Sequence, residues 1–194
     1  MAHSRPFSYD SSMKHTSGLS LVLAAVWVFS ACATLESRAK EDLSDGYALL
    51  YDLVSKEKQA SQLSLVKTIS PELKSLLERI SETSKVTAKE LETLARVDPP
   101  LNLKATHLPR IERAARESTD KETTRQALRS TGMDLEFNMV SSQLAAMNYG
   151  AHLARSLAVI DTNPRRKEFL LQTDRKFSDL HGQVYKMLFT RYQR

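Results

Sequence analysis

Histidine and glutamate side chains are the first candidates for catalytic or metal-binding chemistry in this chain. Beyond residue 31 the sequence contains three histidines, His107, His152 and His181. A dinuclear carboxylate site in a helical protein needs a glutamate three residues before a histidine on each of two helices. Tyr149 stands three residues before His152, and Ser178 stands three residues before His181. We therefore predict neither a metal site nor a bound cofactor.

A second set of candidates consists of polar residues at positions where a helical repeat predicts burial. Glu57 and Ser61 fall on one such repeat, and Ser84 and Thr87 fall on the next. A buried carboxylate is unfavourable unless it is paired. Two interpretations remain open. Either Glu57 lies at the edge of the core beside a lysine or arginine while the hydroxyl groups bond to nearby backbone, or the four residues line a small polar pocket that binds a ligand.

Other kinds of active site find no support in the sequence. No glycine-framed serine marks a nucleophile turn, and no glycine-rich loop is suited to hold a phosphate. The methionines fall on or beside apolar repeats, so we expect them to fill the core. We therefore expect a protein that is not an enzyme.

The single cysteine of the chain, Cys32, follows an apolar run and cannot form a disulfide within the chain. Residues 19–29 carry no charge and are too few to span a bilayer as a helix, which takes about 20 residues. Such a run is typical of a secretory signal peptide. Lys14 precedes it, and the small residues Ser30 and Ala31 follow it.

The sequence Phe29-Ser30-Ala31-Cys32 resembles the lipobox of bacterial lipoproteins. The resemblance implies that residues 1–31 are a signal peptide and that Cys32 becomes the acylated N-terminus of the mature protein. Several acyl chains on one residue suffice for stable anchoring to a membrane. The resemblance therefore implies a lipid-anchored protein of the cell envelope.

The residues around the predicted cleavage site refine this expectation. Ala33 follows the cysteine where some lipoproteins carry the aspartate that retains them in the inner membrane. By the same resemblance we expect the periplasmic face of the outer membrane. Residues 32–43 are polar and are expected to act as the lipidated N-terminus and tether. The start of the chain is left open between Met1 and Met13.

The charge of the chain does not point to nucleic acid. The formal net charge is +5, and without residues 1–31 the chain has 26 Lys and Arg against 22 Asp and Glu. The two signs alternate along the sequence, whereas nucleic-acid binding usually needs a basic stripe. The expected partners are the membrane, through the lipid anchor, and another envelope protein.

Apolar residues recur every three or four positions from residue 44 onward, which is typical of amphipathic helices. Ser70-Pro71 and Asn163-Pro164 are signals for helix starts, and Gly132 marks a break or a kink. Residues 98–109 are expected to form a loop. The predicted helices cover residues 44 to 68 or 69, 71–97, 110–130, 133 to at least 158, and 164–192.

Four of the five predicted helices have regular inward-facing stripes, and one does not. The stripe of the fourth is the most regular. The helix over residues 110–130 has a weak apolar face, so we expect a partly exposed connecting helix. The predicted stripes are Tyr47, Leu50, Val54, Glu57, Ser61 and Leu65; Leu73, Leu77, Ile80, Ser84, Thr87, Leu91 and Leu94; Met133, Phe137, Val140, Leu144, Met147, Ala151, Ala154 and Ala158; and Leu170, Thr173, Phe177, Leu180, Val184 and Met187.

Four long helices, with a helical connection between the second and third, are what an antiparallel four-helix bundle with a crossover contains. The segments SPELKSLLERISETSKVTAKELETLA and GMDLEFNMVSSQLAAMNYGAHLA resemble those of bacterial envelope proteins with ferritin-like bundles and no assigned activity. The resemblance covers about residues 45–190. It implies an all-α domain over residues 44–194, and it implies a fold more than a function.

These observations together predict an envelope lipoprotein whose helical domain is a non-enzymatic scaffold or protein-interaction module. The alternative is a ferritin-like bundle that binds a small ligand or metal through the polar layer of Glu57, Ser61, Ser84 and Thr87. In that case His152 and His181 are further candidates for the same layer.

Overall fold

The computed structural model of the chain describes residues 40–104 and 106–192. The predicted signal peptide and Cys32 lie outside these residues. Over the described residues the regular elements are all helical and no strand occurs, which confirms the all-α class. Helix is already present at residue 40, within the segment 32–43 that the sequence predicts to be a tether.

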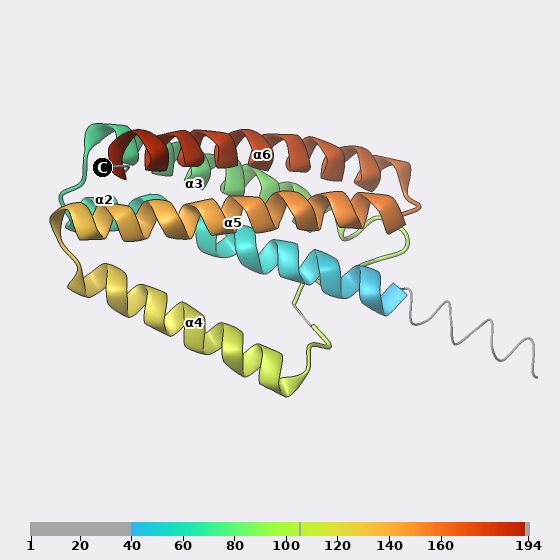
Figure 1. Cartoon of the computed structure of the whole chain (residues 1–194). Helices are drawn as coiled ribbons and strands as arrows, with labels where there is room; N and C mark the ends of the chain where they lie inside the picture. Colours follow the sequence, from blue (N-terminus) through green and yellow to red (C-terminus); the bar gives the residue numbers. More distant parts are fainter. Residues whose placement is uncertain (1–39, 105, 193–194) are drawn as a thin grey trace, which may run out of the picture. The chain divides into compact units, whose positions relative to one another are not determined.

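The elements follow the chain in the order shown in Figure 1. We call the first one the N-terminal helix, and we call the N-terminal helix, α3, α5 and α6 together the helical core. The bounds are residues 40–57 for the N-terminal helix, then η1 (Ala60–Gln62), α2 (Leu63–Val66), α3 (Pro71–Leu94), α4 (Arg110–Arg129), α5 (Gly132–Ile160) and α6 (Pro164–Tyr192).

The prediction that the first helix continues to Thr68 or Ile69 is wrong. The helix ends at residue 57, and a turn, η1 and α2 follow. The hydroxyl group of Ser81 in α3 donates a hydrogen bond to the carbonyl oxygen of Lys58, at 2.6 Å. That carbonyl is one that a continuing helix would use for its next turn. A contact from another element therefore accompanies the end of a helix that the apolar repeat alone would extend.

The other helix boundaries agree with local signals in the sequence. Pro71 and Pro164 are the first residues of α3 and α6, where a proline loses no helical hydrogen bond. The side-chain oxygen of Asn163 accepts hydrogen bonds from the backbone N–H groups of Arg165 and Arg166, both at 3.1 Å, and so caps α6. Gly132, the first residue of α5, has a φ of 57°, a conformation that favours glycine, and it follows the break between α4 and α5.

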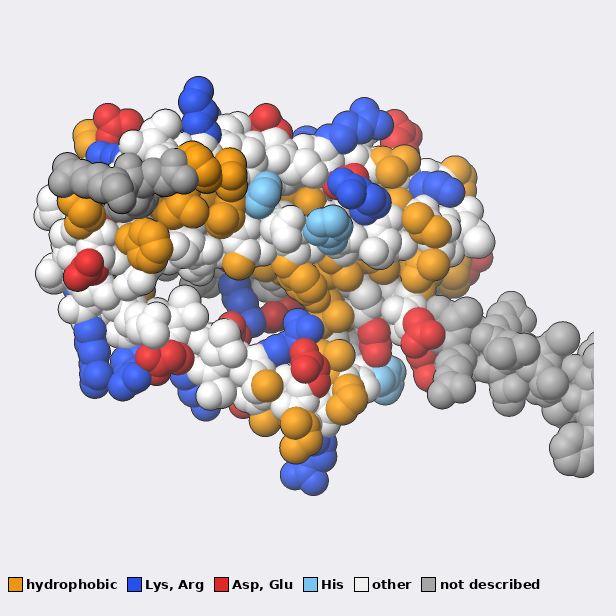
Figure 2. Space-filling view, in the orientation of Figure 1, with side chains coloured by type: hydrophobic (Ala, Val, Ile, Leu, Met, Phe, Trp, Pro, Cys, Tyr) orange, Lys and Arg blue, Asp and Glu red, His pale blue; other side chains and the backbone are white. Residues whose placement is uncertain are grey.

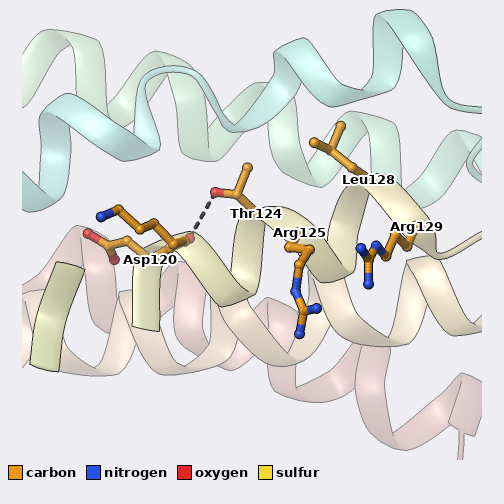
Figure 3. Close-up of a pocket in the computed structure, with 6 residues that line it drawn as sticks. Asp120, Thr124, Arg125, Leu128 and Arg129 are labelled. Carbon is orange, nitrogen blue, oxygen red and sulfur yellow. Dashed lines mark hydrogen bonds between the residues drawn. The ribbon is translucent and has the colours of Figure 1, made fainter. Parts of the chain in front are cut away.

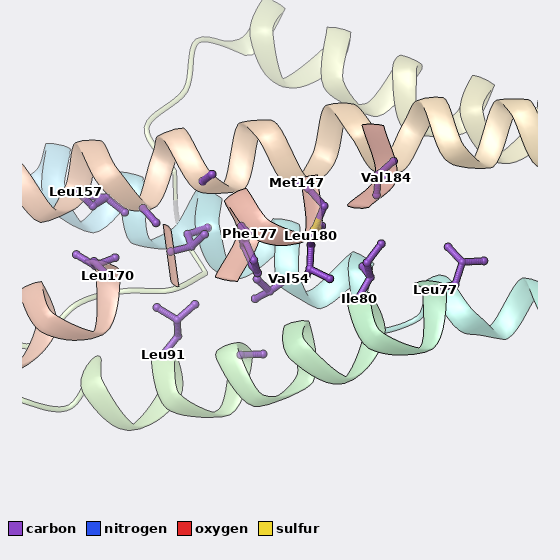
Figure 4. Close-up of a cluster of buried hydrophobic side chains, with 14 of the residues drawn as sticks. Val54, Leu77, Ile80, Leu91, Met147, Leu157, Leu170, Phe177, Leu180 and Val184 are labelled. Atoms are coloured by element: carbon purple, nitrogen blue, oxygen red, sulfur yellow. The ribbon is translucent and has the colours of Figure 1, made fainter. Parts of the chain in front are cut away.

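Apolar side chains from all four helices of the core point toward one another (Figure 4). Val54 of the N-terminal helix, Ile80 of α3, Met147 of α5 and Phe177 of α6 are all fully buried. Burying a side chain of this size contributes roughly 1.5–3 kcal/mol. The core is therefore held by packing along its length.

Close approach of α5 and α6 depends on Gly150. A Cβ atom at this position would lie 2.5 Å from Phe177 Cδ2 and 2.8 Å from Leu53 Cδ2. These separations are far below van der Waals contact, so no larger residue fits without a shift of its neighbours. Gly150 lets α5 pack directly against both the N-terminal helix and α6.

The inward stripes of α3 and α6 are confirmed, because all their residues are buried or half-buried. The stripe of α5 is wrong at its start. Met133 and Phe137 are 66% and 45% exposed, while Leu135 and Met139 are buried. The predicted and the observed inward faces of α5 differ by a rotation about the helix axis, and both have apolar residues at helical spacing. The sequence of α5 is apolar on more than one face, so the repeat does not select between them.

A polar cluster joins the start of α3, the start of α5 and the end of α6. Glu136 of α5 accepts hydrogen bonds from the backbone N–H of Ser70, at 2.5 Å, and from its hydroxyl group, at 3.1 Å. Arg191 of α6 lies 3.0 Å from the same carboxylate and also contacts the Ser70 hydroxyl group. Ser70 therefore precedes α3 without capping it by its side chain.

Candidate functional site

The structure places the predicted polar residues in different surroundings. Ser84 is fully buried, and its hydroxyl oxygen has no hydrogen-bond partner among the described residues. Thr87 is buried and donates to the carbonyl oxygen of Thr83, at 2.8 Å. Ser61 is half-buried and lies 3.3 Å from the hydroxyl group of Ser81. The four predicted residues therefore do not form one hydrogen-bonded group.

Glu57 is the ionisable member of this set. The residue is half-buried, but its Oε2 atom is buried and has no hydrogen-bond partner within the described residues. Burial raises the pKa of its carboxyl group, against the effects of a hydrogen bond with Gln143 and of the nearby Lys56 charge. No ion pair of Glu57 is found over residues 40–104 and 106–192. Its contact in the core is an amide of α5, which the sequence analysis missed.

Each helix of the core supplies one buried oxygen of this unpartnered kind. They are Glu57 Oε2, Ser84 Oγ, Gln143 Oε1 and Gln183 Oε1. Amide oxygens and ionised carboxylates only accept hydrogen bonds, and a buried polar atom left without a bond costs about 1–3 kcal/mol. Over the described residues, the two amide oxygens and the ionised form of the Glu57 carboxyl group are thus buried acceptors without a donor, whereas the Ser84 hydroxyl group can both donate and accept. Glutamine on an apolar repeat is the sequence signal that could have identified the two amides.

The histidines are spread over the surface. His152 is exposed and His181 is half-buried, and His107 in the loop before α4 lies 3.0 Å from Asp45. In the part of the chain that the structure describes, no three His, Cys, Asp or Glu side chains lie close enough together to hold a metal ion. Neither His152 nor His181 forms a hydrogen bond with any of the four oxygens of the core.

The most completely bonded polar group is a buried ion pair between Arg166 of α6 and Asp161 after α5. Both side chains are fully buried, and two hydrogen bonds of 2.8 and 3.1 Å join them. The hydroxyl group of Tyr47 donates to Asp161 at 2.7 Å. Arg166 also donates to the carbonyl oxygens of Val97 and Pro99. The cluster joins the N-terminal helix, the end of α3, α5 and α6.

Electrostatics in this cluster favour the ionised pair. Burial alone would raise the pKa of Asp161, but hydrogen bonds from Arg166, Tyr47 and the Asn163 N–H lower it on balance. Burial and the hydrogen bond to Asp161 raise the pKa of Tyr47. The donors and acceptors satisfy one another and leave no group aimed at a ligand, so the arrangement is suited to holding four segments together. In the sequence, Arg166 is recognisable only as one of three consecutive basic residues, Arg165-Arg166-Lys167.

α4 is built differently from the rest of the molecule. None of its residues is buried, and Ile111 is 82% exposed. Ion pairs within the helix join Arg116 to Glu112 and Arg125 to Glu122. Such pairs each stabilise a helix by only a few tenths of a kcal/mol. The prediction of a connecting helix with a weak apolar face agrees with this.

Polar groups attach α4 to the core. Lys67 donates to the carbonyl oxygens of Leu128 and Ser130, at 2.7 and 3.2 Å, near the end of α4. Lys56 of the N-terminal helix lies 2.6 Å from Asp120. Partial burial opposes the charge of Lys56, but hydrogen bonds to Asp120 and Asp52 raise its pKa on balance.

A third contact lies nearer the start of α4. The guanidinium group of Arg116 lies 5.8 Å from the ring centre of Tyr149 in α5, a separation at which a cation is attracted to an aromatic ring. Hydrogen bonds with Tyr149 and Glu112 raise the pKa of Arg116. Between such contacts α4 stands apart from the core, and the space-filling view shows a hollow there (Figures 1 and 2).

Two adjoining pockets lie against α4, and we call them together the α4 groove. One, of about 390 Å³, lies between α4, the N-terminal helix and the loop before α4. The other, of about 450 Å³, is lined by α4 residues and shares Asp120 with the first. Figure 3 shows Thr124 and Leu128 on one side of α4 and Arg125 and Arg129 on another. The charged lining residues are Lys56, Lys104, Arg113, Arg116, Lys121, Arg125 and Arg129, with Asp52, Glu117 and Asp120.

None of the helices over the described residues is both long enough and apolar enough to cross a membrane. No family model, curated protein or solved structure matches this chain.

Proposed function

We propose that the protein is a non-enzymatic envelope lipoprotein that uses α4 to bind another protein at a membrane surface. The observation that carries this proposal is the contrast between α4, which has no buried residue, and the helices beside it. A long helix held away from a packed core by polar contacts offers both of its sides to a partner. The lipobox-like sequence ending at Cys32 supports attachment to the membrane.

Contacts between helix ends support a more detailed proposal for the fold. We propose an antiparallel four-helix bundle of the ferritin-like kind, with α4 as the crossover between its second and third helices. Tyr47, in the first half of the N-terminal helix, contacts Asp161, which follows the end of α5. Ser70, which precedes the start of α3, contacts Arg191 near the end of α6. Such contacts are expected when neighbouring helices run in opposite directions. An experimental structure in which α3 and α6 ran parallel would refute this.

The membrane part of the proposal is tested by mass spectrometry of the protein extracted from the membranes of its own host. The expected mass is that of residues 32–194 plus acyl chains. A Cys32→Ser variant should keep residues 1–31 and lose the lipid. An unlipidated wild-type protein that retains residues 1–31 would contradict the proposal.

The partner part is tested by photo-crosslinking in the same membranes. A photoreactive residue is placed at Thr123 in α4 and, as a control, at Lys176 on the exposed face of α6. The expected result is one partner, identified by mass spectrometry, that crosslinks from Thr123 and not from Lys176. Equal crosslinking from the two positions would show that α4 is not the binding element.

A second candidate function rests on Glu57 and Gln143, which share a hydrogen bond and each have a buried oxygen without a partner among the described residues. A small ligand or cation that carries hydrogen-bond donors or positive charge would complement them, with Glu57 as the charged group. The test is thermal unfolding in the presence of ammonium, methylammonium, Mg²⁺ or Ca²⁺. This function predicts a rise of the melting temperature that is lost in Glu57→Gln and kept in Glu78→Gln, an exposed control. Equal responses of both variants would refute it.

A further inference from the structure

The α4 groove has an excess of basic groups that the rest of the described chain lacks. Its walls carry seven Lys and Arg side chains against three Asp and Glu. Residues 40–192 as a whole have 24 Lys and Arg against 21 Asp and Glu. The net positive charge of the groove, +4, is therefore larger than the +3 of this whole region. Positive charge is concentrated in the linings of these two pockets and is balanced elsewhere.

Ion pairs inside the groove use up the acidic groups and leave basic groups available. Asp52 and Asp120 both pair with Lys56. Four basic residues of the groove have no ion-pair partner within the described residues: Lys104, Arg113, Lys121 and Arg129. Of the three acidic residues, only Glu117 has no ion-pair partner there. A ligand with several negative charges would therefore meet four unpaired cations and one unpaired anion.

Apolar side chains lie among these charges. Leu49, Leu103 and Leu108 line one pocket, and Leu128, which is 57% exposed, lines the other. From Arg113 to Arg129 the helix rises by about 24 Å. That length accommodates an extended peptide of about seven residues or a longer helical one. The groove is thus suited in size to a peptide segment.

We propose that the α4 groove binds an acidic peptide segment of another protein, with apolar residues of that segment on the leucines of the groove. This inference rests on the proposed function and specifies its partner. The carboxylates of the peptide pair with Lys104, Arg113 and Lys121. The leucines among these charges suit the apolar side chains of a peptide better than the phosphate backbone of a nucleic acid. The pocket between α4, the N-terminal helix and the loop before α4 is less accessible to a planar membrane surface than to a peptide.

The binding experiment uses the full-length protein in detergent and two fluorescein-labelled peptides. One peptide repeats Glu-Glu-Leu four times, and the other repeats Lys-Lys-Leu four times. Fluorescence anisotropy is expected to show binding of the first peptide only, with an affinity that falls at least about tenfold between 50 and 300 mM salt, because exposed charges are screened. Equal binding of both peptides, or binding insensitive to salt, would overturn the proposal.

A pair of matched variants locates the binding. Lys104→Glu, Arg113→Glu and Lys121→Glu together reverse charges of the groove, and the control combines Arg175→Glu, Lys176→Glu and Lys186→Glu on α6. All six residues are exposed, so both proteins are expected to keep the wild-type circular dichroism spectrum and melting temperature. The dissociation constant of the Glu-Glu-Leu peptide should rise at least about tenfold in the groove variant only. Equal losses in both would overturn the proposal.

Two further probes separate the groove from the other anionic partners. Vesicles of phosphatidylglycerol and a single-stranded oligonucleotide are added as competitors of the labelled peptide. Failure of both to displace it, at equal charge concentration, supports a peptide site, and displacement by either overturns it. If the peptide does not bind while the crosslinks from Thr123 persist, the acidic partner is wrong and the proposed function stands.

Discussion

α4 and α5 are neighbours in the chain, yet they are held in opposite ways. α4 has no buried residue and is attached to the core by Lys56, Lys67 and Arg116. α5 has ten buried residues and packs along α6. The comparison shows that forming a helix and joining the core are separate properties of a sequence. Ion pairs within the helix support α4, whereas burial of apolar surface stabilises α5.

The largest expected effect is the loss of a core aromatic side chain. Phe177→Ala should lower the free energy of unfolding by about 3–5 kcal/mol, because it removes a fully buried ring and leaves a cavity. The matched change in α4, Ile111→Ala, should alter it by less than about 0.5 kcal/mol. Urea denaturation followed by circular dichroism measures both. Similar losses for the two variants would remove the distinction between the two helices.

The buried ion pair gives the next largest effect. Arg166→Met should cost about 3 kcal/mol, because Asp161 then stays buried without its charged partner. Arg113→Met in α4 is the control and should cost little. The low folded-state pKa of Asp161 means that its contribution is present above the unfolded-state pKa of about 3.9 and is lost as pH falls through the lower folded value. The difference between the free energies of unfolding of the wild type and Arg166→Met should therefore become smaller only at acidic pH.

Gly150 and Gly182 both lie in helices of the core, Gly150 at a closely packed position and Gly182 at an open one. Gly150→Ala should cost about 1–3 kcal/mol, because the new Cβ atom overlaps Phe177 and Leu53. Gly182→Ala in α6 meets no atom within 4 Å and should stabilise the protein by about 0.5–1 kcal/mol through better helix propensity. Thermal unfolding of the two variants is the measurement. A stabilised Gly150→Ala variant would show that α5 and α6 are not in close contact.

Glu57 has a buried carboxyl oxygen without a hydrogen-bond partner among the described residues, whereas no residue of α4 is buried. Burial raises the pKa of its carboxyl group. The stability of the wild type should therefore fall as pH rises from the unfolded-state pKa, about 4.3, through the raised folded-state value. Glu57→Gln should remove this slope and add about 1 kcal/mol at neutral pH. An unchanged slope in the variant would show that the carboxylate is not desolvated.

The sequence predicts the helical class and most helix ends, because these depend on signals that lie close together in the chain. Pro71, Asn163-Pro164 and Gly132 are examples. It does not predict the end of the first helix, where Ser81 of α3 bonds to Lys58. It also misplaces Met133 and Phe137, because α5 is apolar on more than one face. Both errors arise where another segment decides the outcome.

The candidate sites divide in the same way. Glu57, Ser84 and Thr87 lie on apolar repeats, so their location near the core is predictable from spacing. Gln143 as a contact of Glu57 is not, because it depends on how α5 is rotated. The α4 groove follows from a local property, the weak apolar face of residues 110–130, but its lining by the N-terminal helix requires the folded chain. Spacing identifies a face, and only tertiary structure identifies what it meets.

The central claim, that α4 is presented by the core and is not part of it, is tested most directly by hydrogen-exchange mass spectrometry of the full-length protein. Opening of α4 exposes no fully buried residue, so its amides over residues 114–129 should exchange at least about 100-fold faster than those of residues 140–157 in α5. Equal protection of the two helices would contradict the account, because it would show that α4 unfolds only together with the core.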